Sequence, residues 1–592
     1  RNMKLKYLFG ILICFLITGI VAAQTTDTFK WWNPAGNAFP VLEGQAWPKE
    51  VKSFYDRLPA RAEQTVRKEV WDLSRHSAGL YIKFKSNSDQ IMVRYGATSK
   101  GNFAMPHMPA TGVSGVDLYA IDHSGRWVWA PGQYHFGDTI TYKYSNLEAD
   151  KNYRSRVFEF RLFLPLYNGV SWMEIGVPQG KTLIPMPLSE EKPVVIYGTS
   201  IAQGGCASRP GMAWTAILER QLDYPLINLG FSGNGRLEKP VIDLMTEIDA
   251  KIYVLDCLPN LVNIPDKELE AKIRESVKGL QAKRPSTPVL LVEHSLGSHA
   301  GIINAKRVED CERSTKVLQQ TFAQLKSEGV KNIYILSNAA LGMDINSTVD
   351  GSHPTDLGMK QHADAYTKVI RKIVHEPANP AFSTTQPVVQ DRDGYDWKAR
   401  HNEIITLNKK LPPRNVIIAN SIIHFWGGEP KDAIVRGADS WNRYLAPLDT
   451  RNLAFGWDRI ENALWRVYHG ALDGYKAEHV VLMIGTNNLA INTNEEIIAG
   501  LKQLVEAVQL RQPATGILLS GIFPRRDMEK RVAGINAAIQ KLALAKKATY
   551  INPGRVFLKS TGKIDENLFS DGLHPNAAGY SKLAPVLAGF LK

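Results

Sequence analysis

Six residues of the types used in nucleophilic catalysis occur as two copies of one arrangement. In each copy a serine follows a short apolar segment, and an Asp-x-x-His-Pro motif comes much later in the same region. The two sets are Ser200, Asp350 and His353, and Ser421, Asp571 and His574. The differences 421 − 200, 571 − 350 and 574 − 353 are all 221. One such pattern is weak evidence, but two copies in register predict tandem domains that carry out acyl transfer.

These residue types suit attack of a hydroxyl group on an ester carbonyl. A serine hydroxyl becomes a good nucleophile when a base removes its proton, and an imidazole suits that role near neutral pH. A carboxylate fixes the tautomer of the imidazole and stabilises its charged form. The oxyanion that develops needs preorganised N–H donors. In the first copy, the backbone of Gly233 and the side chain of Asn260 are the candidate donors.

The elements that would position these residues are apolar strands that alternate with helices. The expected strands are 194–197, 226–229, 252–255, 289–292 and 333–336, and then 416–419, 452–455, 480–484, 517–520 and 549–551. The expected helices include 214–221, 266–283, 356–374 and 577–591, the last with Asn576 as its N-cap. This alternation predicts two α/β domains, each with a doubly wound, five-stranded parallel sheet. Ligands bind at the carboxyl ends of such strands, so the candidate residues should converge there.

The region that precedes these domains has a different pattern. Short segments rich in aromatic and β-branched residues, at 91–95, 116–121, 127–129, 157–164 and 172–177, predict a β-sandwich or jelly roll over 28–187. A helix is expected near 51–71. The Pro-rich segment 105–112 is either a structural turn or a loop over the first active site. The predicted boundaries are 28–187 for the β domain, 192–375 and 397–592 for the α/β domains, and 376–396 for a linker.

The first α/β domain resembles the SGNH hydrolases, also called the GDSL esterase family. The motifs Ile-Tyr-Gly-Thr-Ser-Ile, Phe-Ser-Gly-Asn-Gly and Asp-Gly-Ser-His-Pro, with Asn260 between the last two, follow the order of the four blocks of that family. The resemblance implies a flavodoxin-like fold. It also implies that Ser200 is the nucleophile and an oxyanion donor, that Gly233 and Asn260 complete the oxyanion hole, and that Asp350 and His353 complete the triad.

The second α/β domain is similar to the branch that contains the catalytic subunits of platelet-activating-factor acetylhydrolase. The segments Asn-Leu-Ala-Phe-Gly-Trp-Asp at 452–458, Leu-Trp-Arg at 464–466 and Gly-Thr-Asn-Asn at 485–488 carry this likeness. It implies that Ser421, Asp571 and His574 form a triad and that Asn487 is an oxyanion donor. Trp457 stands where the oxyanion glycine of the family aligns. Its backbone N–H can still donate, but its side chain should narrow the acyl side of the site.

The N-terminal segment predicts a secretory signal peptide over 1–23. Lys4 and Lys6 precede an apolar run at 7–22, which ends in the small residues Val-Ala-Ala. The run is short for a membrane anchor. We therefore expect a bacterial protein that is periplasmic or secreted, with no insertion in a membrane after cleavage.

Composition and charge exclude several other classes. The formal net charge is +13, but Lys and Arg are scattered among acidic residues, which favours a solvated surface over a nucleic-acid site. Beyond the signal peptide the cysteines are Cys206, Cys257 and Cys311, an odd number that excludes a full disulfide framework but leaves one bridge open. The sequence has no compact His/Cys cluster, so we expect neither a metal nor a cofactor.

Together these features predict an exported serine esterase that removes O-acetyl groups from an acetylated polysaccharide or oligosaccharide. The order of a β-sandwich before an SGNH domain is similar to that of some carbohydrate esterases, and a narrow acyl side favours a small acyl group. One alternative is a short-chain lipase or thioesterase of the same fold. Another is a glycan-binding protein in which an SGNH domain is degenerate.

Overall fold

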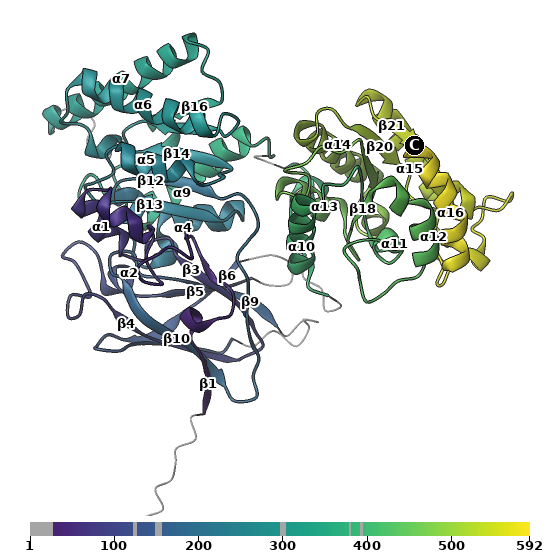
Figure 1. Ribbon diagram of the computed structural model, residues 1–592, viewed down its shortest axis with the longest axis horizontal. Helices are drawn as coiled ribbons and strands as arrows, with labels where there is room; N and C mark the ends of the chain where they lie inside the picture. The colour runs from purple at the N-terminus through teal and green to yellow at the C-terminus, as the bar shows by residue number, and fades with distance from the viewer. Residues whose placement is uncertain (1–27, 122–126, 148–156, 296–302, 378–379, 391–394) are drawn as a thin grey trace, which may run out of the picture.

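The computed structural model describes residues 28–121, 127–147, 157–295, 303–377, 380–390 and 395–592. The expected signal peptide at 1–23 lies outside these residues. Within the described ranges, no helix combines the length and the apolar character needed to cross a membrane. Figure 1 shows a β-rich unit beneath a first α/β unit, with a second α/β unit beside them.

The β-rich unit is built from two antiparallel sheets. One has the strand order β1-β10-β4-β8-β7 and the other β11-β3-β9-β5-β6, with β2 paired to β3. The first sheet contains β1 (Phe29–Trp32), β4 (Gln90–Ala97), β7 (Gly132–His135), β8 (Ile140–Ser145) and β10 (Val170–Pro178). The second contains β2 (Leu42–Glu43), β3 (Tyr81–Ser86), β5 (Asp117–Ile121), β6 (Trp127–Ala130), β9 (Phe158–Phe163) and β11 (Leu183–Pro185). Alternate side chains of β4, such as Ile91 and Val93, enter the shared core.

The helix expected near 51–71 is wrong in most of its length. The structure has a 3-10 turn at Ala60–Gln64 and the helix α1 at Lys68–Ser74, while Val51 pairs with Pro59 in an isolated β-bridge. A proline disfavours helical geometry at the residue before it, which explains the break. The side chain of Arg57 extends to the first α/β unit, where its guanidinium donates hydrogen bonds to the carbonyls of Asn228 and Gly230. The other helices described in this unit are the 3-10 turn at Pro34–Gly36 and the short α2 (Ala110–Val113).

The first α/β unit has the predicted parallel sheet, in the order β13-β12-β14-β15-β16. Its strands are β12 (Val194–Gly198), β13 (Leu226–Gly230), β14 (Ile252–Asp256), β15 (Val289–Val292) and β16 (Ile333–Leu336). Its helices are α3 (Ser200–Gln203), α4 (Trp214–Leu222), α5 (Lys239–Thr246), α6 (Asp266–Lys283), α7 (Ala305–Ser327), α8 (Asn338–Leu341) and α9 (Asp356–Ile373). Every residue of β12 is buried, as expected for a strand with helices on both faces.

The second α/β unit repeats this order as β18-β17-β19-β20-β21. Its strands are β17 (Asn415–Ala419), β18 (Thr450–Ala454), β19 (His479–Met483), β20 (Gly516–Ser520) and β21 (Thr549–Ile551). Its helices are α10 (Trp397–Lys410), α11 (Ser421–His424), α12 (Ala438–Tyr444), α13 (Ile460–Tyr468), α14 (Asn494–Arg511), α15 (Glu529–Ala545) and α16 (Ala577–Phe590). Asn576 caps α16 as predicted, because its side chain accepts the N–H of Gly579. Both sheets confirm the predicted flavodoxin-like fold.

Polar contacts join the second α/β unit to the first. Lys251 and the hydroxyl of Tyr224 both donate to the carbonyl of Tyr468, at 2.8 and 3.3 Å. The ring of His469 lies 2.7 Å from the carboxyl of Glu191, and both side chains are buried. The two α/β units therefore contact each other directly, as well as through the connecting chain.

Candidate active sites

The structure brings Ser200, His353 and Asp350 together at the carboxyl edge of the first parallel sheet. Ser200 is the first residue of α3, directly beyond β12. Its Oγ lies 2.8 Å from Nε2 of His353, and Nδ1 of the same ring lies 2.7 Å from Oδ2 of Asp350. The other carboxylate oxygen accepts the N–H groups of Ser352 and His353, which fixes the turn that carries the histidine. A hydroxyl, an imidazole and a carboxylate thus form one hydrogen-bonded chain.

The second site has the same chain of contacts. The Oγ of Ser421 lies 2.9 Å from Nε2 of His574, and Nδ1 of His574 lies 2.7 Å from Oδ2 of Asp571. Asp571 also accepts the N–H groups of Leu573 and His574. Ser421, Asp571 and His574 were predicted from sequence, and the structure places the three together.

The carboxyl groups of both sites are held in the ionised form. Burial raises the pKa of Asp350, but the N–H and ring of His353 and the N–H of Ser352 outweigh it and lower the pKa to about 2. The corresponding contacts from His574 and Leu573 lower the pKa of Asp571 to about 2 against the same effect of burial. Each carboxylate is therefore charged at neutral pH and can stabilise a protonated imidazole.

The candidate oxyanion donors of the first site lie on two loops. Gly233 has a left-handed backbone with φ of +70°, three residues beyond the end of β13. Asn260 lies beyond β14, and its Oδ1 accepts the N–H of Gly235 at 3.1 Å. That contact fixes which end of the Asn260 amide is the donor. The side chain and the glycine loop are thereby held together.

In the second site, Trp457 takes the place of the glycine. Its φ is +60°, and it lies three residues beyond the end of β18. The N–H of the preceding residue, Gly456, is bound to Nδ1 of His424 at 2.8 Å, so the Trp457 N–H is the counterpart of the Gly233 donor. Asn487 donates to the carbonyl of Asp458 at 2.9 Å, which orients its amide beside the same loop. The Trp457 ring lies 6.2 Å from that of Phe425.

The β-rich unit reaches the first active site. The ring of His107, in the Pro-rich segment 105–112, lies 5.9 Å from that of His353. Tyr167 donates to the carbonyl of Ser200 at 3.2 Å. The sequence left open whether 105–112 is a structural turn or a loop over the active site, and the structure places His107 of this segment beside the triad. The unusual Pro-His-Met-Pro composition was the one signal that pointed to this contact.

Among the described residues, neither a disulfide nor a cluster of metal-ligating side chains accompanies the two sites. Cys206, Cys257 and Cys311 are buried and unbridged, so the disulfide that the sequence left open does not form in this structure. Burial raises the pKa of the Cys206 thiol to about 12, which disfavours the thiolate needed for nucleophilic attack. Across the described part of the chain, no group of three His, Cys, Asp or Glu side chains is arranged to hold a metal ion.

Comparison with known families agrees with this geometry. Residues 191–371 and 420–582 each match a GDSL-like lipase/acylhydrolase family, and residues 29–183 match the N-terminal region of SGNH-hydrolase-type esterases. The chain belongs to the GDSL, or SGNH, hydrolase family, whose members hydrolyse esters, and it contains two hydrolase domains.

Individual relatives resemble parts of the chain. A structure described as a GDSL-like lipase from Bacteroides ovatus is 31% identical with a TM-score of 0.53, and the match covers 59% of this chain and 98% of that one. The alpha1 subunit of human platelet-activating factor acetylhydrolase IB is 27% identical over 219 residues, which are 36% of this chain and 90% of the relative. The bovine alpha2 subunit is 27% identical over 216 residues, or 36% of this chain and 89% of that subunit.

Proposed function

We propose that this protein is an exported serine esterase that removes O-acetyl groups from a complex carbohydrate. The observation that carries the proposal is the pair of Ser–His–Asp chains, each beside a left-handed loop residue and an oriented asparagine. In this proposal Ser200 and Ser421 are the nucleophiles. Export rests on the expected signal peptide at 1–23.

The reaction at each site has two halves. Nε2 of the histidine takes the Oγ proton as the serine oxygen attacks the acetyl carbonyl. The backbone N–H of the serine, the N–H of Gly233 or Trp457, and the amide of Asn260 or Asn487 bind the negative oxygen of the tetrahedral intermediate. The C–O bond to the sugar then breaks, and the histidine gives its proton to the departing sugar hydroxyl. Water, deprotonated by the same histidine, releases acetate and restores the serine.

Two features support a small acyl group on a sugar. The Trp457 ring packs against that of Phe425, whose ring lies 6.3 Å from that of His574, and we infer that it limits the room for the acyl chain in the second site. The β-rich unit exposes the aromatic side chains of Trp129 and Tyr134, which are 46% and 55% exposed. Flat aromatic surfaces with a polar edge are suited to contact with sugar rings.

A second candidate is hydrolysis of a small ester on a lipid. The similarity to platelet-activating factor acetylhydrolase subunits favours it, because those relatives are named for removal of an acetyl group from a lipid. A glycan-binding role without turnover is less favoured, since both triads have complete hydrogen-bonding geometry.

The two enzymatic candidates are separated by comparing substrates. Acetate release from a panel of acetylated polysaccharides is measured beside acetate release from an acetylated phospholipid, at equal acetyl concentration. The proposal expects the higher kcat/KM on at least one polysaccharide. A preference for the phospholipid over every polysaccharide would establish the lipid alternative.

A further inference from the structure

The segment expected to be a linker contacts the proposed oxyanion loop of the second site. Nε2 of Gln390 donates to the carbonyl oxygen of Gly456 at 3.0 Å, and the hydroxyl of Tyr395 donates to the same oxygen at 3.0 Å. Gln390 is buried, with 6% of its surface exposed. Two donors from this segment therefore hold one carbonyl group of the loop.

That carbonyl shares a peptide group with the Trp457 N–H. A trans peptide is planar, so its C=O and N–H point in opposite directions, and fixing one fixes the other. Hydrogen bonds accepted by a carbonyl also polarise the N–H of the same peptide and strengthen it as a donor. The contacts of Gln390 and Tyr395 thus set both the direction and the donor strength of the N–H assigned to the oxyanion.

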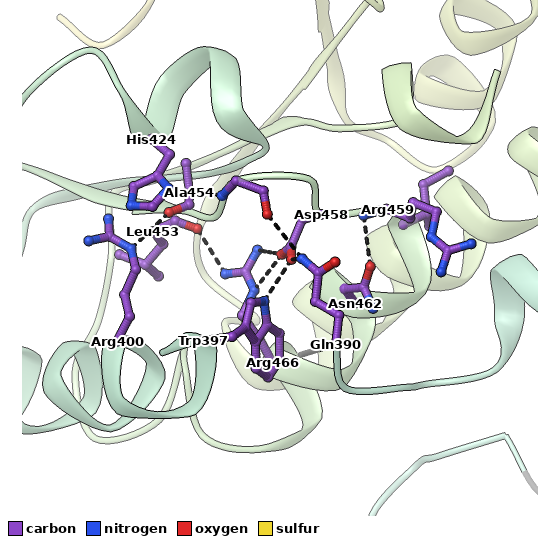
Figure 2. Close-up of polar contacts among 12 residues, drawn as sticks. Gln390, Trp397, Arg400, His424, Leu453, Ala454, Asp458, Arg459, Asn462 and Arg466 are labelled. Atoms are coloured by element: carbon purple, nitrogen blue, oxygen red, sulfur yellow. Dashed lines mark hydrogen bonds and ion pairs between the residues drawn. The ribbon is translucent and has the colours of Figure 1, made fainter. Parts of the chain in front are cut away.

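Asp458 links the same segment to the core of the second domain. Its Oδ1 accepts hydrogen bonds from Nε2 of Gln390 at 2.6 Å and from Nε1 of Trp397 at 2.8 Å. Its Oδ2 accepts a hydrogen bond from Nε of Arg466 at 2.9 Å. Asp458 and Arg466 are both fully buried. Figure 2 shows Gln390, Trp397 and Arg466 converging on this carboxylate. The side chain of Gln390 is therefore held by a rigid partner while it binds the Gly456 carbonyl.

The first domain fixes the corresponding peptide in a different way. There the Ser232 carbonyl belongs to the same peptide group as the Gly233 N–H. This carbonyl accepts a hydrogen bond from Nδ2 of the nearby Asn234 at 2.8 Å. The position equivalent to Asn234 is Asp458, which as a carboxylate has no N–H to donate. The second domain thus lacks the local donor, and Gln390 and Tyr395 supply the missing contact from outside the loop.

We propose that Gln390 and Tyr395 are positioning residues for the second oxyanion hole. This inference rests on the proposed function, because it assumes that Ser421 is a nucleophile. A left-handed tryptophan is a disfavoured conformation that persists only where its surroundings impose it. Hydrogen bonds on both sides of Gly456 provide that constraint: its N–H donates to Nδ1 of His424, and its carbonyl accepts from Gln390 and Tyr395.

The test isolates the second site with Ser200→Ala and then adds Tyr395→Phe, which deletes one hydroxyl. The matched control is Tyr475→Phe in the same domain, because the Tyr475 hydroxyl also donates to a backbone carbonyl, that of Ala471, at 3.0 Å. We expect Tyr395→Phe to lower kcat for a small acetyl ester by about tenfold with KM within about twofold, since a less fixed donor binds the transition state less well. Adding Gln390→Leu should lower kcat further.

A second readout separates positioning from folding. A small trifluoromethyl ketone forms a tetrahedral adduct with the serine, so its inhibition constant reports on the oxyanion hole. The constant should rise in Tyr395→Phe by about the same factor as kcat falls and stay unchanged in Tyr475→Phe, with similar melting temperatures. Equal effects in the two variants, or an unchanged kcat in Tyr395→Phe, would overturn the inference alone. Activity of Ser200→Ala no higher than that of Ser200→Ala/Ser421→Ala would overturn the proposed second active site, and the inference with it.

Discussion

Gly233 and Trp457 have the same left-handed backbone conformation at the same place in two copies of one fold. Their φ angles are +70° and +60°, and each lies three residues beyond the end of the second strand of its sheet. Glycine adopts this conformation without a steric penalty, whereas another residue pays about 1–2 kcal/mol. The second domain thus tolerates strain at a position whose ring packs against Phe425, and the Phe425 ring lies 6.3 Å from that of His574.

Replacing the ring should change acyl selectivity. We expect Trp457→Gly, in the Ser200→Ala background, to raise the octanoyl-to-acetyl rate ratio by about tenfold, which corresponds to roughly 1.4 kcal/mol. The reciprocal control is Gly233→Trp with Ser421→Ala, because a side chain at Gly233 would meet no atom within 4 Å of its Cβ. That variant should lower the same ratio at the first site. Chain-length profiles that do not change in either variant would contradict a role of this position in acyl selection.

The local donor of the first domain can be removed with little change of shape. Asn234→Asp keeps the oxygen that accepts from Arg67 but deletes the Nδ2 donor to the Ser232 carbonyl. In the Ser421→Ala background we expect kcat for an acetyl ester to fall about fivefold to tenfold with little change in KM. Steady-state kinetics beside Asn346→Asp, a surface control in the same domain, provide the measurement. A fall in kcat that the control reproduces would point to a general charge effect.

Sequence patterns predicted the α/β units well because, in these units, local secondary-structure preferences and the pattern of buried apolar residues indicate the same elements. All ten parallel strands were expected, since strands covered on both faces are continuously apolar. The helix at Asp266–Lys283 matches the expected range in full. The triads were predicted from the repeated serine and Asp-x-x-His-Pro motifs, their common offset and the resemblance to the SGNH hydrolases, and the fold brings them together because the ends of different strands meet at one edge.

The β-rich unit and the surroundings of the sites were harder to predict. The strand β8 alternates buried and exposed residues, but its mixed polar and aromatic sequence was not recognised as a strand. The helix expected at 51–71 was wrong because the proline at 59 and the buried Arg57 impose a bent path. The contact from Gln390 to Gly456 spans 66 residues and depends on how the segment packs, which no periodicity reveals.

The Glu191–His469 contact between the α/β units should make stability depend on pH. Burial raises the pKa of Glu191 from 4.5 to about 8, although the charges of Lys251 and His401 oppose the shift, and burial lowers the pKa of His469. The protonated carboxyl is therefore favoured in the folded state. Its stabilisation is complete below the unfolded pKa and is lost as the pH rises toward the folded pKa.

Glu191→Gln should remove this dependence. The free energy of unfolding of the wild type should fall relative to the variant between pH 5 and pH 8, on the order of 1 kcal/mol per pH unit. Differential scanning fluorimetry of both proteins at several pH values across this range provides the check. Buried neutral histidines lower the stability of the folded protein as the pH falls. Both proteins contain these histidines, so the comparison cancels their effect. Parallel curves for the two proteins would contradict the assignment of a neutral carboxyl at 191.

The two domains should act on different acetyl groups. Gln203 and Arg209 follow the nucleophile of the first domain, whereas Phe425 and Trp426 follow that of the second, and only the first site has His107 beside it among the described residues. Because transition-state binding depends on these surroundings, Ser200→Ala and Ser421→Ala should leave different acetylated positions on one natural glycan. NMR of the residual polymer after each reaction identifies them. Identical residual acetyl patterns would show that the domains are redundant.

The most direct measurement of the central claim is acetate release from an acetylated polysaccharide by the wild type, the two single serine variants and Ser200→Ala/Ser421→Ala. The two-nucleophile account predicts partial release by each single variant and none above the uncatalysed rate by the double variant, whose melting temperature should match that of the wild type. Release by the folded double variant at a rate close to that of the wild type would show that neither serine is the nucleophile.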